Sequence, residues 1–231
     1  MTNALRAYYQ LAKPGIVYGN ALVAAAGFVY ASKEAVSWPL FVYTLLGLSL
    51  VIASACVCNN YYDRDIDKKM SRTAARPLAA GHIRRQAALA YGAFLGIAGI
   101  LLLYFFTTLP AFFIALAGWA VYVLLYTPLK HVTAHALWVG AIAGATPPVV
   151  GYAAVTGFLD LHALWLFIFL FIWQIPHFLG IAAYRHDEYA EAGVPLLLAK
   201  PSARGKKVGR IVFYISLVAL LVWCGALMLH K

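Results

Sequence analysis

Long runs of apolar residues, separated by short polar segments, dominate the chain. Seven of these runs approach or reach the roughly 20 residues with which a helix crosses a bilayer. They span residues 15–31, 39–58, 87–106, 109–126, 135–155, 161–180 and 211–229. Helices are the expected form because the bilayer core offers no water to satisfy backbone polar groups. The pattern therefore predicts an all-α, polytopic membrane helix bundle with seven transmembrane helices, forming a single domain over residues 1–231.

The composition agrees with a membrane location. Of the 231 residues, 64% are hydrophobic and only 11% are charged, and the mean hydropathy is +0.79. A soluble domain of this composition would expose an aggregating surface. The first apolar run could be a signal peptide, but six more runs and no convincing cleavage site favour a retained helix. No Arg-rich and Ser-rich amphipathic leader is visible, which favours a bacterial cytoplasmic membrane.

The net charge of +10 is distributed unevenly. With the N-terminus placed in the cytoplasm, 16 of the 18 Lys and Arg residues fall on the inner side, and only Lys33 and Lys231 fall outside. This bias is the positive-inside pattern of membrane proteins. The basic charge therefore reflects topology, and nucleic-acid binding is not expected.

A first acidic cluster follows the second apolar run. Asn59, Asp63 and Asp67 have the spacing i, i+4 and i+8, which places three oxygen ligands on one face of a helix. Mg²⁺ takes few protein oxygens and completes its coordination shell with water and phosphate oxygens. The trio therefore predicts a Mg²⁺ site for a phosphorylated substrate. The alternative is a solvated loop beside the membrane.

A second acidic cluster follows the sixth run and lies on the same predicted side as the first. Asp187, Glu188 and Glu191 could hold a second ion, although only Asp187 and Glu191 share a helical face. The alternative is a short surface helix whose acids pair with Arg185. Two acidic clusters four helices apart also indicate a weak internal repeat, with a site at the repeat interface.

Basic side chains accompany both acidic clusters, and they could bind a diphosphate. Arginine binds phosphate oxygens through a planar fork, while a lysine supplies a point charge. Topology-setting charges and a membrane-interface anchor are the alternatives. The candidates for diphosphate binding are Lys68, Arg72, Arg76, Lys130 and Arg185. The candidates for a direct role in catalysis are Asp63, Asp67 and Lys130.

Two apolar runs contain polar or helix-breaking residues. The sixth carries Gln174 and His177, and such residues inside a membrane indicate function by default. His177 could be a haem-iron ligand, a haem-propionate contact or a general base, while a structural hydrogen bond is the alternative. The fifth run contains Pro147 and Pro148, which break a helix where a cavity or protein satisfies the freed carbonyls. This helix is therefore expected to line a central cavity. His131 and His135 have metal-pair spacing but are interpreted as interfacial.

Several of these stretches together resemble the UbiA superfamily of intramembrane prenyltransferases, and within it the haem O synthases. The similarity runs from about residue 8 to residue 200 in the same order. It rests on Lys13-Pro14-Gly15, the stretch 59–67, Met70-x-Arg72-Thr73-x-x-Arg76-Pro77-Leu78, the stretch 126–130, Gly144-Ala145-x-Pro147-Pro148, Trp173-Gln174-x-Pro176-His177 and Glu188-Tyr189-x-x-Ala192-Gly193-x-Pro195.

The resemblance implies farnesyl diphosphate and haem B as substrates, haem O as product and Mg²⁺ as the ion. Both acidic clusters would bind Mg²⁺-diphosphate, the basic residues would assist departure of pyrophosphate, and His177 and Gln174 would contact haem. A haem vinyl group would attack the farnesyl cation, and water would complete the product. Haem A synthase and terminal oxidase assembly proteins are further candidate partners.

Two features depart from the family pattern. Family members usually have nine helices, so the last two are either dispensable here or the chain is truncated, and Glu188 stands where aspartate is common. Two alternatives remain at this stage. One is a prenyltransferase that acts on a quinone-precursor ring, and the other is a non-catalytic haem-binding assembly subunit.

Overall fold

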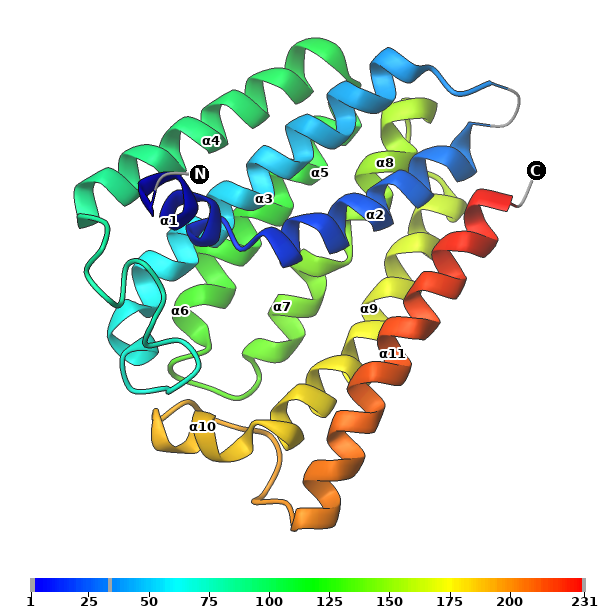
Figure 1. Cartoon of the computed structure of the whole chain (residues 1–231). Coiled ribbons are helices and arrows are strands. Elements are labelled where there is room, and N and C mark those ends of the chain that lie inside the picture. The colour runs from blue at the N-terminus through cyan, green and yellow to red at the C-terminus, as the bar shows by residue number, and fades with distance from the viewer. Residues whose placement is uncertain (1–2, 33–34, 230–231) are drawn as a thin grey trace.

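A computed structural model describes residues 3–32 and 35–229, and it is helical throughout its regular elements (Figure 1). Lys33 and Lys231, which were predicted to lie outside, are not among the described residues. The elements are α1 (Asn3–Leu11), α2 (Pro14–Ala31), α3 (Trp38–Asp67), α4 (Arg85–Phe106), α5 (Leu109–Ala120), the π-helix η1 (Val121–Tyr126), α6 (Thr127–Leu129), α7 (Ala136–Gly144), α8 (Thr146–Thr156), α9 (Leu161–Tyr184), α10 (His186–Glu191) and α11 (Ala203–Leu229).

The predicted set of seven spans is confirmed. Over the described ranges, seven helical stretches are long and apolar enough to cross a membrane. They are α2, α3, α4, Leu109–Leu129, Ala136–Thr156, α9 and α11. Three helices extend further than their apolar runs, because backbone hydrogen bonding continues into polar sequence once protein or water surrounds it. α3 continues to Asp67, α9 passes through Pro176 to Tyr184, and α11 begins at Ala203.

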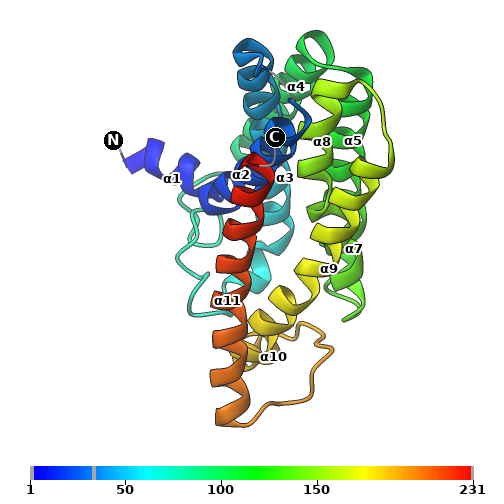
Figure 2. The same cartoon turned by 90° about the vertical axis from the view of Figure 1, so that its right-hand side faces the viewer.

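The long helices form an up-and-down bundle (Figures 1 and 2). α3 pairs with α4, α9 pairs with α11, and α2 packs against α8, α11 and α3. One end of the bundle holds the last turns of α3 and α9, the first turns of α4 and α11, and the short helices α6 and α10. We call it the polar end, since its helix turns and loops carry the Lys and Arg residues of the stretches 64–85 and 185–210 and Lys130. α1 extends away from the bundle in Figure 2.

The fifth span is broken as predicted, between α7 and α8. Pro147 has no N–H to donate to the carbonyl of Ala143, and the hydroxyl of Thr146 donates to that carbonyl instead at 2.8 Å. The side-chain amide of Gln174 on α9 donates to the carbonyl of Ala141 at 3.1 Å. The break is therefore satisfied by protein groups, as non-helical backbone in a membrane requires.

Close contact between α2 and α8 depends on glycine. A Cβ atom at Gly151 would lie 2.0 Å from the carbonyl oxygen of Ala24, and one at Gly27 would lie 2.1 Å from that of Pro148. Both obstacles are backbone atoms, which cannot move aside as a flexible side chain can. Small residues at such positions let membrane helices approach each other closely.

We predict that Gly151→Ala destabilises the bundle by about 1–3 kcal/mol, the usual cost of overpacking. Gly225→Ala is the matched control, because a Cβ atom at Gly225 in α11 meets nothing within 4 Å. The thermal unfolding midpoint of each variant in detergent provides the measurement. Equal midpoints for the two variants would contradict the α2–α8 packing described here.

Candidate active site

A cavity of about 630 Å³ lies inside the bundle. Its walls come from α2, α3, α5, η1, α7, α8, α9, α10 and α11, together with the loops at the polar end. The predicted central cavity is therefore present. The fifth span lines it through Gly140, Gly144 and Pro147, as expected from the helix break.

The two parts of this cavity differ in chemistry. Toward the polar end it is lined by Lys13, Asn59, Asp63, Asp67, Arg72, Arg76, Lys130 and His131. Farther along the helices it is lined mainly by apolar side chains, among them Val23, Leu48, Val51, Ala115, Leu170, Leu217 and Leu220. A ligand that matches this cavity has a charged head and an apolar body.

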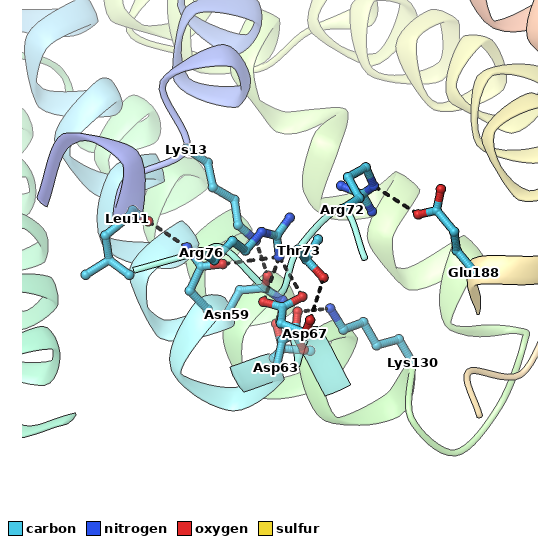
Figure 3. Close-up of polar contacts among 12 residues, drawn as sticks. Leu11, Lys13, Asn59, Asp63, Asp67, Arg72, Thr73, Arg76, Lys130 and Glu188 are labelled. Carbon is cyan, nitrogen blue, oxygen red and sulfur yellow. Dashed lines mark hydrogen bonds and ion pairs between the residues drawn. The ribbon is translucent and has the colours of Figure 1, made fainter. Parts of the chain in front are cut away.

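The first acidic cluster forms as the helical spacing predicted. Because α3 continues to Asp67, all three side chains of the trio fall on one face of one helix, and all three line the cavity. Asn59, Asp63 and Asp67 are only 1%, 5% and 2% exposed. Figure 3 shows them side by side beneath the basic side chains.

Each member of the trio has a cationic partner in this structure. Lys130 pairs with Asp63, and Lys13 donates to the side-chain oxygen of Asn59. Arg76 donates to both carboxylate oxygens of Asp67, at 2.9 and 2.8 Å. Three cations thus face two carboxylates. The excess positive charge favours an anionic ligand at this end of the cavity.

The loop that carries Arg76 is fixed to the end of α3. The hydroxyl of Thr73 donates to the carbonyl of Asp67 at 3.0 Å, and Arg76 contacts the side-chain oxygen of Asn60 at 3.4 Å. Asn60 in turn donates to the carbonyl of Leu11 at 2.8 Å, at the end of α1. These bonds hold α1 and the loop 68–84 against the same helix end.

Lys13 is a site residue that the sequence analysis did not single out. It is the one non-glycine residue in the described part of the chain with positive φ, at 52°, and it lies between α1 and α2. This bend directs the side chain toward Asn59 (Figure 3). Burial lowers the pKa of Lys13 to about 8. The usable sequence signal is a lysine directly before Pro14, since proline disfavours a helical residue before it.

The prediction for His131 needs correction. His131 was interpreted as interfacial, but its side chain is only 19% exposed and lines the cavity. Its Nε2 atom lies 3.0 Å from the carboxylate of Asp63, on the other oxygen from the one that Lys130 contacts. The turn that follows α6 brings both residues to Asp63, which sequence spacing alone does not reveal.

The π-helix places two tyrosines in the cavity wall. Tyr122 and Tyr126 are both half-buried there, with ring centroids 5.1 Å apart. A Cβ atom at Gly140 would lie 2.9 Å from the ring of Tyr126, so this glycine leaves the room that the ring occupies. Single π-turns inside helices occur frequently at functional sites.

The second acidic cluster does not line the cavity. Asp187 pairs with Lys206 of α11, and Glu188 accepts from Arg185 at 2.8 Å and from Arg72 at 3.3 Å. Glu191 is exposed. The two clusters are connected through Arg72, which lines the cavity and contacts Glu188 (Figure 3). A second ion at Asp187, Glu188 and Glu191 stays a prediction.

Two of the predicted diphosphate ligands also lie away from the cavity lining. Lys68 is about half exposed and contacts Asp65 at 3.5 Å. Arg185 packs over the ring of Tyr184, 4.8 Å from its centroid, and pairs with Glu188. The remaining three candidates, Arg72, Arg76 and Lys130, line the cavity.

Gln174 and His177 both line the cavity, but they have different partners. The amide of Gln174 donates to the carbonyls of Ala141 and Leu170, at 3.1 and 3.2 Å, so it supports the wall. His177 contacts the hydroxyl of Ser216 at 2.8 Å through Nδ1. Its other ring nitrogen has no described partner.

The donor set at the polar end fits Mg²⁺. Among the described residues, no three His, Cys, Asp or Glu side chains converge, so the amide oxygen of Asn59 would be the third ligand beside Asp63 and Asp67. Such hard oxygen donors suit Mg²⁺, which binds few protein ligands and shares its remaining positions with water and phosphate. The neighbouring Lys and Arg side chains supply the positive charge that a phosphate group needs.

The model of the UbiA prenyltransferase family matches residues 20–231. This chain belongs to that family. Its fold and cavity are therefore those of a multi-pass UbiA-type membrane protein. Among similar curated proteins, the protoheme IX farnesyltransferase of Francisella tularensis subsp. novicida is 45% identical over 214 residues, which cover 91% of this chain and 75% of the relative. That of Citrobacter koseri is 44% identical, covering 90% and 70%.

Solved structures of UbiA homologues have the same fold. A UbiA homologue from Archaeoglobus fulgidus bound to DMAPP and Mg²⁺ superposes with a TM-score of 0.69 at 14% identity, covering 93% of this chain and 86% of that one. An apo UbiA homologue from Aeropyrum pernix superposes with a TM-score of 0.66 at 16% identity, covering 94% and 81%. At these identities the likeness concerns the fold.

We predict that Lys13→Met weakens binding of inorganic pyrophosphate with Mg²⁺ by about tenfold, which corresponds to about 1.4 kcal/mol and to the loss of one charged hydrogen bond. Lys68→Met removes the same charge from an exposed position outside the cavity lining and should leave binding unchanged. Isothermal titration of the two purified variants provides the measurement. An equal effect of both substitutions would show that only the general basic charge matters.

Proposed function

We propose that this UbiA family member transfers the farnesyl group of farnesyl diphosphate to a vinyl group of haem B, giving haem O and diphosphate. The observation that best supports this proposal is the two-part cavity, in which partly buried cations and buried carboxylates adjoin an apolar chamber. Both substrates combine a large apolar body with anionic groups. The similar proteins named protoheme IX farnesyltransferase add support for this pair of substrates.

In this proposal Asn59, Asp63 and Asp67 would hold Mg²⁺, which when bound neutralises charge on the diphosphate. Lys13, Arg76 and Lys130 stand beside these ligands and would bind the diphosphate oxygens. Arg72 approaches from the loop 68–84 and would bind the same anion.

The transfer begins when the bond between farnesyl C1 and oxygen breaks and leaves its electron pair on the diphosphate. Lys13, Arg76 and Lys130 are held in place by their partners before the reaction, so they stabilise this charge with little reorganisation. The allylic cation then lies beside the aromatic faces of Trp119, Tyr122 and Tyr126, which line the cavity and can stabilise it by cation–π attraction.

The apolar chamber keeps water from the cation until the haem vinyl carbon attacks it. A new carbon–carbon bond forms, positive charge moves to the vinyl carbon next to the pyrrole ring, and water adds there with loss of a proton. His177 would bind the haem iron through its free ring nitrogen, whereas Gln174 would support the wall, because both its donors bond to carbonyls.

The basic polar end would face the cytoplasm, with the N-terminus on the same side. This orientation follows from the positive-inside rule, because the Lys and Arg residues of the stretches 64–85 and 185–210 and Lys130 lie on the segments at this end. A bacterial cytoplasmic membrane agrees with the bacterial origin of the similar proteins. Haem A synthase or oxidase assembly proteins would then receive the product.

We predict that Asp63→Asn lowers farnesyl transfer at least 100-fold, because the variant loses both a metal ligand and the partner of Lys130. Asp65→Asn is the matched control, since Asp65 is exposed two residues away and contacts Lys68 and Arg64. The purified protein is incubated with haem B, farnesyl diphosphate and Mg²⁺, and haem O is detected by mass. Chelation of Mg²⁺ should reproduce the loss. Full turnover by Asp63→Asn would overturn the role of Asp63, whereas no haem O from the unsubstituted protein would favour a non-catalytic haem carrier.

His177→Ala should abolish the absorption spectrum of a histidine-ligated haem in a titration with haem B. Added imidazole should restore this spectrum, because it can occupy the space that the side chain leaves. A variant that binds haem as the parent protein does would remove the case for His177 as ligand, whereas a parent protein that binds no haem would favour a quinone-precursor ring as the acceptor.

A further inference from the structure

Ser216 on α11 receives two hydrogen bonds from α9. The indole nitrogen of Trp173 donates to its carbonyl oxygen at 2.8 Å, and Nδ1 of His177 lies 2.8 Å from its hydroxyl oxygen. Trp173 and His177 are one helical turn apart, and their rings are stacked with centroids separated by 4.8 Å. A single residue therefore fixes both rings on the cavity wall.

The direction of the bond between His177 and Ser216 follows from the hydroxyl. Ser216 donates to the carbonyl of Phe213 at 2.7 Å. A serine hydroxyl has only one proton, and with that proton on the Phe213 carbonyl its oxygen accepts from His177. This arrangement places the imidazole proton on Nδ1. In neutral histidine the other nitrogen, Nε2, then has a free lone pair, and no group in the described part of the chain occupies it.

The surrounding helices hold this arrangement rigidly. One turn beyond His177, a Cβ atom at Gly180 would lie 2.9 Å from the carbonyl oxygen of Gly209, so α9 and α11 touch backbone to backbone. Phe213 also packs against the imidazole, with ring centroids 5.0 Å apart. The close helix contact and the neighbouring rings restrict the movement of the imidazole.

We propose that Ser216 is a positioning residue for haem binding. It fixes the tautomer and the orientation of His177, so that an unprotonated Nε2 is available to ligate the iron of haem. An acceptor on the far nitrogen also raises the basicity of the ligating one. This inference rests on the proposed function, and specifically on His177 as the iron ligand.

The test is a titration of the purified full-length chain in detergent with haem B. Ser216→Ala should weaken haem binding about tenfold, the lower end of the effect of losing an outer-shell partner. Resonance Raman spectra of the ferrous complex should show the iron–histidine stretch at lower frequency than in the parent protein, since Nδ1–H loses its acceptor. Ser216→Thr keeps a hydroxyl acceptor and should restore both values.

Ser54→Ala is the matched control. Like Ser216, Ser54 is a buried serine that accepts from an indole, but it accepts through its hydroxyl, from Trp119 at 3.2 Å, and has no described imidazole partner. The Ser54→Ala substitution should leave the frequency of the iron–histidine stretch unchanged. Gel filtration and the thermal unfolding midpoint identify any variant that fails to fold. If Ser216→Ala fails to fold, the frequency in Ser216→Thr decides, because a value below that of the parent protein overturns the inference.

Two results would overturn the inference in different ways. If Ser216→Ala keeps the affinity and frequency of the parent while His177→Ala loses the ligated spectrum, Ser216 has no positioning role and the haem assignment stands. If His177→Ala keeps the parent spectrum, the inference fails together with His177 as ligand. The farnesyl-transfer assay with Asp63→Asn then shows separately whether the prenyltransferase function survives.

Discussion

Two carboxylates buried at the end of a membrane helix are the constraint around which the polar end is organised. Removing a carboxylate from water costs several kcal/mol unless charge and hydrogen bonds compensate for it. Asp63 and Asp67 obtain this compensation from Lys130, His131 and Arg76, which come from segments far apart in the sequence. The same pairs that stabilise the fold therefore gather the cations that an anionic substrate needs.

The sequence alone predicted the features that depend on local periodicity. The seven spans, the common face of the trio and the break before Pro147 all follow from helical geometry and from the chemistry of proline. The features that depend on tertiary contact could not be predicted. Lys13 reaches Asn59 across 46 residues, and His131 reaches Asp63 across 68. No local pattern encodes such distances.

The second acidic cluster illustrates a further limit of sequence analysis. Residue spacing and the predicted membrane topology placed both clusters at the same end of the bundle. They do not specify which face of α10 points toward the cavity. Tyr189 lines the cavity, while Asp187 and Glu188 pair with Lys206 and Arg185. Asp187 instead connects α10 to α11, and Glu188 connects it to the loop 68–84. Both acids lie outside the cavity lining.

The π-helix determines the direction in which the side chains that follow it point. An α-helix turns by about 100° for each residue, so the wide turn of η1 decides which way Thr127 and Lys130 face relative to α3. If one residue were removed from Val121–Tyr126, the backbone hydrogen bonds could follow the ordinary α-helical pattern throughout. Lys130 would then rotate away from Asp63, although the composition of the span would hardly change. A one-residue deletion in this segment of a related sequence would therefore affect the active site more than its length implies.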